Sequence, residues 1–480
     1  MNYEAHSAPR TIARNTVIQL IGRMAFLALS LINFRLIANY LGPTLYGDYG
    51  NIFNFIALFT VLTDFGLFIV AVREISQKPE RRQHIMENVL SLRFILAAGA
   101  SLLAIGSAWL ISYFAPDSGY AANLGGIAVG ALSMLIYFMS NMLDVVFHIE
   151  LKMGYVAIVE FINKAVAVGY VALAVKWQLP FIWIVAGVAI GNLAGFLARG
   201  LTSKQFFSLR LRYDPQTWKW LLSMAIPLGL VFALNQVYFK VDGIMLYAMS
   251  GSYDTGIYTA AYRILETTLF VAAFFVQAMT PYLSNFVVKK PSEARKLITA
   301  GTEILFAAGG AIALAVAIFA PQIVNLLAGP DYLLATYPLW YLAATIGVLY
   351  LNSLLGQVLV LLDQRKILLI MAVIILGFNI GANFWLIPRF SYLGAAAATL
   401  VSELILLATN VVLLRRRHLL EWRPDKLVSI ILGLGVLAGA MWWAQLLAWP
   451  WIACFFGMPV IYFLVLWNRG ALPVNALIRR

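Results

Sequence analysis

Ionisable side chains interrupt the long apolar segments of this sequence, and they are its clearest candidates for chemistry. Six basic residues remain there once the loop cations are set aside, namely Arg23, Arg35, Arg93, Lys164, Lys240 and Arg263. The acids within the segments include Asp64, Asp144, Glu160, Asp242, Glu266 and Glu403. A charge at the centre of a membrane-spanning helix costs roughly 2.5–3.5 kcal/mol on insertion scales. Each of these residues therefore needs a charged partner, a wet cavity or a ligand.

Two pairs among these charges have a spacing that lets them neutralise each other within one helix. Side chains three or four residues apart share a helix face. This spacing describes Glu160 with Lys164, and Arg263 with Glu266. For both pairs, a structural ion pair and a functional role remain open alternatives.

Other charges need a partner from a different segment. Arg93 and Asp64 fall toward the same side of neighbouring segments, which predicts a salt bridge between them. Asp144 lies near the end of its segment and is expected to extend to the membrane interface. Lys240 and Asp242 are two residues apart, so they point to different sides of a helix and cannot pair with each other.

The remaining pattern is an excess of cations in the first, seventh and eighth apolar segments. A guanidinium group binds two phosphate oxygens at once, so these cations predict a phosphate-binding site formed by Arg23, Arg35, Lys240 and Arg263. The candidates for carrying a coupled H⁺ or Na⁺ are Asp64, Asp242, Glu266 and Glu403. Pro227, within "AIPLG", removes a backbone hydrogen bond and is a candidate hinge, although a static kink explains it equally well.

The segments that position these charges have the length and composition of membrane spans. The chain has 480 residues, of which 62% are hydrophobic and 11% are charged, whereas soluble domains are about half apolar and a quarter charged. Helices of about 20 apolar residues cross the hydrocarbon core. We predict an all-α polytopic membrane protein with fourteen spans, at approximately 14–40, 47–72, 85–114, 121–147, 153–176, 180–200, 217–249, 255–287, 297–320, 333–362, 366–388, 391–414, 426–446 and 448–468.

Basic residues alternate between the loops and so predict the orientation. The termini and the loops on the same side contain 26 Lys and Arg residues, whereas the opposite loops contain two, Lys176 and Arg389. Positively charged loops face the cytoplasm, so both termini are expected there, in a multi-pass protein of the cytoplasmic (inner) membrane. The net charge of +13 then reflects topology and affinity for anionic lipids, and no nucleic-acid partner is expected.

Several classes of chemistry are disfavoured. The single cysteine, Cys454, cannot form a disulfide within the chain or a thiolate metal site. No Gly-x4-Gly-Lys-Ser/Thr loop for ATP is present, and we expect no metal and no cofactor. A membrane glycosyltransferase would need a catalytic acid-bearing loop, whereas the predicted outer loops are short and hold isolated acids, Asp48, Asp117, Asp254 and Asp331. We therefore expect a protein that is not an enzyme.

Two hairpins repeat the pattern Gly-x4-Gly-x-Tyr between apolar segments. They are "LGPTLYGDYG" at 41–50 and "MSGSYDTGIY" at 249–258. The first hairpin joins spans one and two, and the second joins spans seven and eight. Because six spans is an even number, the two halves are predicted to be parallel repeats. The expected divisions are 1–212, 213–418 and two additional helices in 419–480, with spans one, two, seven and eight lining a cleft.

The sequence resembles the Wzx-like polysaccharide and oligosaccharide flippases of the MOP superfamily (multidrug/oligosaccharidyl-lipid/polysaccharide exporters). In the first half, "YLGPTLYGDYGNIF" and "TDFGL" carry the resemblance. In the second half it rests on "FKVDGIML", "DTGIYTAAYRILE", "IVNLLAGPDYLLA" and "NIGANFWLIPRFSYLGAAAATLVSE". It covers most of the chain up to about residue 415.

This resemblance implies a core of two six-helix lobes with two extra helices. It also implies that the protein moves a polyprenyl-(pyro)phosphate-linked oligosaccharide from the inner to the outer leaflet by alternating access, for surface polysaccharide biosynthesis. The expected partners are this lipid-linked glycan, membrane lipids and glycan polymerase or assembly proteins. A lipid-II type flippase and a cation-coupled drug exporter share the fold and remain alternatives. A drug exporter would favour an acidic or aromatic cavity, whereas the charges here are mainly basic.

Overall fold

The computed structural model describes residues 8–150, 152–203, 210–421, 423–470 and 472. Every regular element in these residues is helical, which confirms the predicted all-α class. The chain divides into two compact units, residues 1–256 and 257–480. The boundary falls within one long helix, shortly after Gly251.

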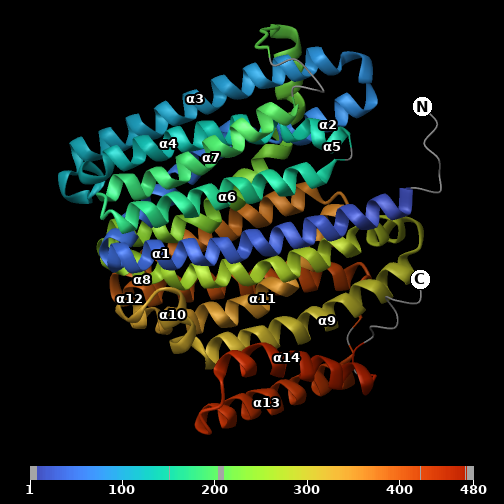
Figure 1. The fold of residues 1–480 in the computed structure, drawn as a ribbon. Helices are drawn as coiled ribbons and strands as arrows, with labels where there is room; N and C mark the ends of the chain where they lie inside the picture. Colours follow the sequence, from blue (N-terminus) through green and yellow to red (C-terminus); the bar gives the residue numbers. More distant parts are fainter. Residues whose placement is uncertain (1–7, 151, 204–209, 422, 471, 473–480) are drawn as a thin grey trace. The chain divides into compact units, whose positions relative to one another are not determined.

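The first unit is a layered bundle of long helices. Helix α4 packs between α3 and α7, and α6 packs between α7 and α1, as Figure 1 shows. Its helices are α1 (Ala8–Asp64), α2 (Leu67–Gln77), α3 (Arg82–Phe114), α4 (Tyr120–Met142), α5 (Asp144–Ile149), α6 (Met153–Lys176), α7 (Phe181–Ser203) and the first part of α8 (Pro215–Lys289), with 3-10 turns η1 (Pro79–Arg81) and η2 (Pro116–Ser118).

The second unit begins within α8 and contains the remaining helices. Helix α11 packs between α9 and α12, while α13 and α14 pack on each other and on α9. The elements are α9 (Pro291–Ile318), α10 (Ala320–Leu327), η3 (Pro330–Ala335), α11 (Thr336–Leu361), α12 (Arg365–Arg416), α13 (Pro424–Leu446) and α14 (Trp451–Asn468).

Three helices are too long to be single membrane spans, and each contains one residue with non-helical backbone. These residues are Gly42 in α1, Gly251 in α8 and Ser391 in α12. The rings of Phe34 and Tyr46 have centroids 5.7 Å apart, whereas twelve positions along a straight helix span about 18 Å. The chain therefore reverses direction near Gly42.

The same reversal occurs in α12. Asn379 Nδ2 donates a hydrogen bond of 3.3 Å to Ser402 Oγ, although a straight helix would separate these residues by about 34 Å. In the part of the chain that the structure describes, eleven helical segments are long and apolar enough to cross a membrane, and the three interrupted ones contain 51 to 56 residues each. Counted as two spans each, those three bring the total to the fourteen that the sequence predicts.

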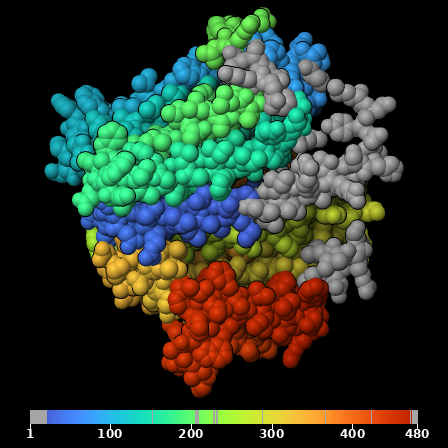
Figure 2. Space-filling view, in the orientation of Figure 1, coloured from blue at the N-terminus to red at the C-terminus, as the bar shows by residue number. Residues whose placement is uncertain are grey.

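The long helices expose large apolar side chains. Leu102 is 70% exposed, Phe114 75% and Val436 74%. In a soluble protein such surfaces would favour aggregation, whereas in a bilayer they contact lipid. Figure 2 shows α13 and α14 (red) with much of their surface uncovered on the displayed face. These features identify a multi-pass membrane protein.

Candidate functional site

The four cations expected to bind phosphate lie on α1 and α8. Arg23 and Arg35 are exposed on α1, and Lys240 is half-buried on the part of α8 in the first unit. Arg263 lies in the second unit, and its Nη1 donates to Glu266 Oε2 at 2.9 Å. The ion pair that the three-residue spacing allows is therefore present.

The acids expected to carry an ion have different surroundings. Asp64 forms a salt bridge with Arg93, and Glu266 forms one with Arg263. Asp242 and Glu403 are buried, with 4% and 1% of their surfaces exposed. The proposed hinge, Pro227, lies within α8, but its side chain is outside the described residues.

The predicted salt bridge between Arg93 and Asp64 is confirmed. Arg93 Nη2 lies 3.1 Å from Asp64 Oδ1, and only 1% of the arginine side chain is exposed. The same guanidinium donates to Met142 Sδ at 3.2 Å and lies over the ring of Phe138. Arg93 thus joins α3 to the end of α1 and to α4, which indicates a structural role.

The expectation that Asp144 extends to the membrane interface is wrong. Arg199 Nε donates to Asp144 Oδ1 at 2.6 Å, and Arg199 Nη1 donates to Ser140 Oγ at 3.1 Å. Both charged side chains are buried, with 5% and 3% exposed. The 26 Lys and Arg residues counted in the termini and loops include Arg199, whereas the structure places it within α7. Packing of α7 against the end of α4 and the start of α5 creates a pair that local spacing could not predict.

Lys164 and Glu160 have the four-residue spacing of a potential ion pair on α6. The ammonium of Lys164 lies 5.5 Å from the ring centre of Phe26, which is a cation–π contact between α6 and α1. This contact helps to attach α6 to α1.

The two glycine hairpins meet inside the first unit. A Cβ atom at Gly47 would overlap the carbonyl oxygen of Ser252, and one at Gly256 would overlap the carbonyl oxygen of Pro43. The other glycine of each repeat, Gly42 or Gly251, has a positive φ of 66° or 85°. The repeated pattern therefore uses its first glycine for the turn and its second for a close backbone approach.

A hydrogen-bond network beside the glycine contact centres on Asp48. Its Oδ1 accepts from Ser252 Oγ at 2.7 Å, Tyr247 OH at 2.8 Å and Asn123 Nδ2 at 3.1 Å. Asn123 Nδ2 also lies 2.9 Å from Tyr247 OH. The sequence suggested an isolated loop acid at this position. Asp48 instead lies in α1 and joins it to α4 and α8. The repeated hairpin pattern was the sequence signal that could have indicated these contacts.

A second buried polar network lies between α11 and α12. Glu403 Oε2 accepts from Asn352 Nδ2 at 2.7 Å, and Asn352 Oδ1 accepts from Asn410 Nδ2 at 3.1 Å. All three side chains are at most 7% exposed. Asn352 is therefore the bridge between the carboxylate of Glu403 and the amide of Asn410.

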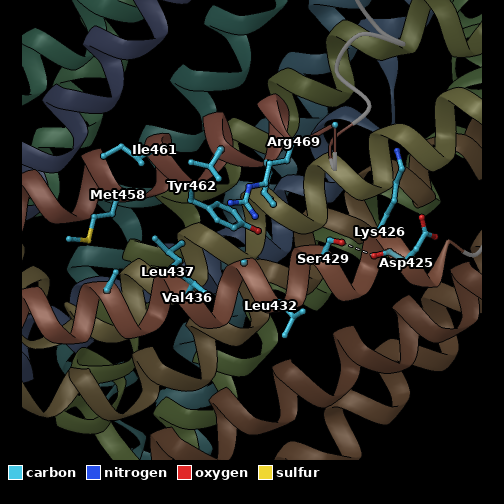
Figure 3. A pocket seen from close by; sticks show the side chains of 15 residues that line it. Asp425, Lys426, Ser429, Leu432, Val436, Leu437, Met458, Ile461, Tyr462 and Arg469 are labelled. Carbon is cyan, nitrogen blue, oxygen red and sulfur yellow. Dashed lines mark hydrogen bonds between the residues drawn. The ribbon is translucent and has the colours of Figure 1, made fainter.

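An apolar groove of about 930 Å³ runs between α13 and α14. Leu432, Val436, Met458 and Ile461 line its apolar part. In Figure 3, Met458 lies toward one end of the groove and Lys426 toward the other. Arg469 lies on the Lys426 side of Tyr462. The groove therefore combines a hydrophobic channel with a charged end, where Asp425 lies beside Lys426.

Ion pairs attach the start of α13 to α9 near this charged end. Arg295 Nε lies 3.0 Å from Glu421 Oε1, and Glu421 Oε2 accepts from Arg423 Nη2 at 3.1 Å. Arg423 Nη1 lies 3.9 Å from the buried Glu303. These contacts fix the segment that precedes Lys426. Among the described residues, no group of three or more His, Cys, Asp and Glu side chains could hold a metal ion.

The fold is that of MOP-superfamily transporters. A lipid II flippase, MurJ, in an inward closed conformation matches with a TM-score of 0.73 and 14% identity, over 94% of this chain and 97% of that one. An inward-facing multidrug resistance MATE family transporter of the MOP superfamily matches with a TM-score of 0.65 and 15% identity, over 84% and 98%. A MOP-superfamily transporter from Pyrococcus furiosus, described as having a binding pocket of reverse polarity, matches with a TM-score of 0.59 and 15% identity, over 85% and 95%.

Matches of the sequence to family models show the family to which the chain belongs. Residues 12–287, more than half of the chain, match the model for polysaccharide biosynthesis proteins, and residues 227–385 match the MatE model. The chain belongs to the polysaccharide biosynthesis protein family. None of the curated proteins compared with it gives a significant match.

Proposed function

We propose that this protein is a flippase that moves a polyprenyl-(pyro)phosphate-linked oligosaccharide from the cytoplasmic to the outer leaflet of the cell membrane. Its membership of the polysaccharide biosynthesis protein family, over residues 12–287, carries the proposal. The cationic excess within the apolar segments supports it, because a phosphate-linked substrate is anionic. The proposed setting is the inner membrane, with both termini cytoplasmic and with glycan assembly proteins as partners.

The substrate has two chemically different parts, and the protein needs a different surface for each. The sugar and phosphate require a polar path across the membrane, whereas the polyprenyl chain is already soluble in lipid. We assign the phosphate to Arg23, Arg35, Lys240 and Arg263, because basic side chains bind phosphate oxygens. The groove of α13 and α14 suits the tail, because Leu432, Val436 and Met458 make its lining apolar.

Alternating access supplies the movement in this proposal. The two hairpins are in close backbone contact at Gly47 and Gly256. In the proposed orientation the hairpins face outward, so release of the glycan requires them to part. Opening also breaks the hydrogen bonds of Asp48, which Tyr247 and Ser252 donate. Pro227 is the proposed bending point of α8.

The membrane potential favours the outward step. Moving one elementary charge across 100 mV is worth about 2.3 kcal/mol, and an anion is driven outward when the cell interior is negative. Coupling to H⁺ or Na⁺ would add to this, with Asp64, Asp242, Glu266 and Glu403 as the proposed carriers. Glu403 suits a proton because it is buried, where a negative charge is costly, and Asn352 holds its carboxylate in place.

Complementation in a host that lacks its own glycan flippase tests the function. Wild-type protein is expected to restore surface glycan. Arg23→Ala and Arg263→Ala are each expected to lower export at unchanged protein level. Lys366→Ala is the matched control, because it removes an exposed cation outside the proposed set. Normal export by both arginine variants contradicts the phosphate assignment, and no export by the wild type contradicts the substrate.

A lipid-II type flippase is the second candidate, since the MurJ structure matches over 94% of the chain. Rescue of a strain depleted of its lipid II flippase, without restoration of surface glycan, would identify this activity. A drug exporter is the third candidate because of the MatE match at 227–385. A drug exporter would raise the drug tolerance of the same host. It would neither rescue the strain depleted of its lipid II flippase nor restore surface glycan.

A further inference from the structure

A second cavity lies in the first unit at the corner where α2, η1 and α3 meet the beginning of α8. It has a volume of about 530 Å³. It is distinct from the groove of α13 and α14 and from the charges within the spans. Its lining includes Lys78, Arg81, His84, Asp214, Thr217 and Trp220.

One wall of the cavity is held in place by backbone hydrogen bonds. The backbone N–H of Asp214 donates to Asn88 Oδ1 at 2.9 Å, and that of Arg212 donates to Ser91 Oγ at 2.7 Å. Both acceptors lie on α3. The start of α8 is thus fixed to α3, and the cavity between them is preformed.

Among the described residues that line the cavity, one carboxylate is present, that of Asp214, and the protein already uses it. Asp214 Oδ2 accepts from Thr217 Oγ1 at 2.7 Å and lies 3.2 Å from His84 Nε2. Asp214 Oδ1 accepts from the backbone N–H of Gln216 at 3.1 Å. These partners offset its negative charge, which leaves the two cations of the cavity to determine its preference.

Those two cations have weak partners or none. Lys78 Nζ lies 4.0 Å from Glu74 Oε2 and 5.9 Å from the ring centre of Trp220, and 47% of its side chain is exposed. The guanidinium of Arg81 has no hydrogen bond or salt bridge among the described residues, and Arg81 is exposed. The cavity therefore offers an ammonium group, an unused guanidinium and an indole ring.

We propose that this cavity binds a phosphate-bearing headgroup at the cytoplasmic surface of the membrane. Arg81 would bind two phosphate oxygens through its planar donors, and Lys78 would supply a second positive charge. Trp220 would cover the apolar part of the headgroup, as interfacial aromatic rings do. Basic pockets at the cytoplasmic ends of transmembrane helices hold anionic headgroups in this way. The site relies on the proposed orientation but not on the transported substrate.

Binding to the full-length protein in nanodiscs of phosphatidylcholine tests the site. Dioctanoyl phosphatidic acid and inorganic phosphate are titrated separately, with affinity read by isothermal titration calorimetry. We expect Lys78→Gln/Arg81→Gln to weaken binding about tenfold or more, since hydrogen bonds to charged groups are lost. Arg81→Lys keeps the charge but loses the planar fork, so it should weaken binding less. Thermal unfolding without ligand shows whether each variant is folded.

The control removes two equivalent charges elsewhere. Lys289→Gln/Lys290→Gln neutralises two exposed lysines at the end of α8 and should bind as the wild type does. Equal weakening in both double variants, or none in either, overturns the proposal, as does a wild type that binds neither probe. Binding of phosphatidic acid alone identifies a lipid as the source of the phosphate, whereas binding of both probes extends the site to soluble phosphate. Glycan export is measured separately, so failure of this site leaves the transport proposal intact.

Discussion

Gly47 and Gly256 face each other at the contact between the two repeated hairpins. A Cβ on Gly256 would lie 3.1 Å from the Gly47 nitrogen, and one on Gly47 would lie 2.9 Å from the Gly256 nitrogen. The relationship is reciprocal because each glycine also approaches a carbonyl oxygen of the other hairpin. A side chain at either position would push the hairpins apart.

Gly47→Ala is expected to destabilise the protein by about 1–3 kcal/mol, since overpacking against backbone cannot be relieved by a rotamer change. Gly99→Ala is the matched control, because nothing lies within 4 Å of a Cβ at that helical position. Alanine is a better helix former than glycine by about 0.5–1 kcal/mol. Thermal unfolding in nanodiscs should therefore show shifts of opposite sign. Equal shifts would mean that the hairpin contact is not close.

Asp48 and Tyr247 are expected to be energetically coupled. Asp48→Ala leaves the hydroxyl of Tyr247 and its neighbouring donors without their acceptor, which costs about 1–3 kcal/mol. A double-mutant cycle with Tyr247→Phe should give a coupling energy of about 0.5–3 kcal/mol. Asp48→Asn keeps one oxygen acceptor and should lose less stability than Asp48→Ala. Strictly additive effects of the two single changes would argue against the network.

Arg199 and Arg263 should differ greatly in their effect on stability. Arg199→Leu leaves Asp144 buried without its cation, which costs about 3–5 kcal/mol. Arg263→Gln breaks a pair whose side chains are 45% and 31% exposed, and it should cost about 0–1 kcal/mol. Protein yield and thermal unfolding report both. Asp144→Leu/Arg199→Leu should recover part of the loss, and a double variant as unstable as Arg199→Leu would contradict the buried-pair explanation.

Asp214 should make stability depend on pH. The hydrogen bond from Thr217 is the main reason why the pKa of Asp214 is lowered, with further help from backbone N–H groups and His84. A carboxyl whose pKa is lower when folded stabilises the protein above its unfolded pKa of about 3.9, and this contribution is lost as pH falls through the folded pKa. Between about pH 5 and pH 3, the wild type should lose more stability than Asp214→Asn. Parallel unfolding curves for the two proteins across this range would refute the prediction.

The local features of the fold were predictable from sequence. Apolar segments of bilayer length predicted the spans, and loops rich in glycine predicted the reversals at Gly42 and Gly251. Arg93 and Asp64 could be paired in advance because they fall at similar depths in neighbouring spans. The length of an apolar segment and the position of a charge can be counted along the chain. The bilayer thickness and the charge rule for loops then give the spans and their orientation directly.

The sequence did not decide which distant side chains meet. Arg199 and Asp144 are 55 positions apart, and Asp48 and Ser252 are 204 positions apart. Nothing in the spacing of these residues determines the rotation of one helix against another, because side chains interlock only when the helices pack. The sequence by itself determined the number of spans and the residues that repeat. The tertiary structure decided that the second glycine of each repeat lies against the other hairpin, since only packing brings two backbones that close.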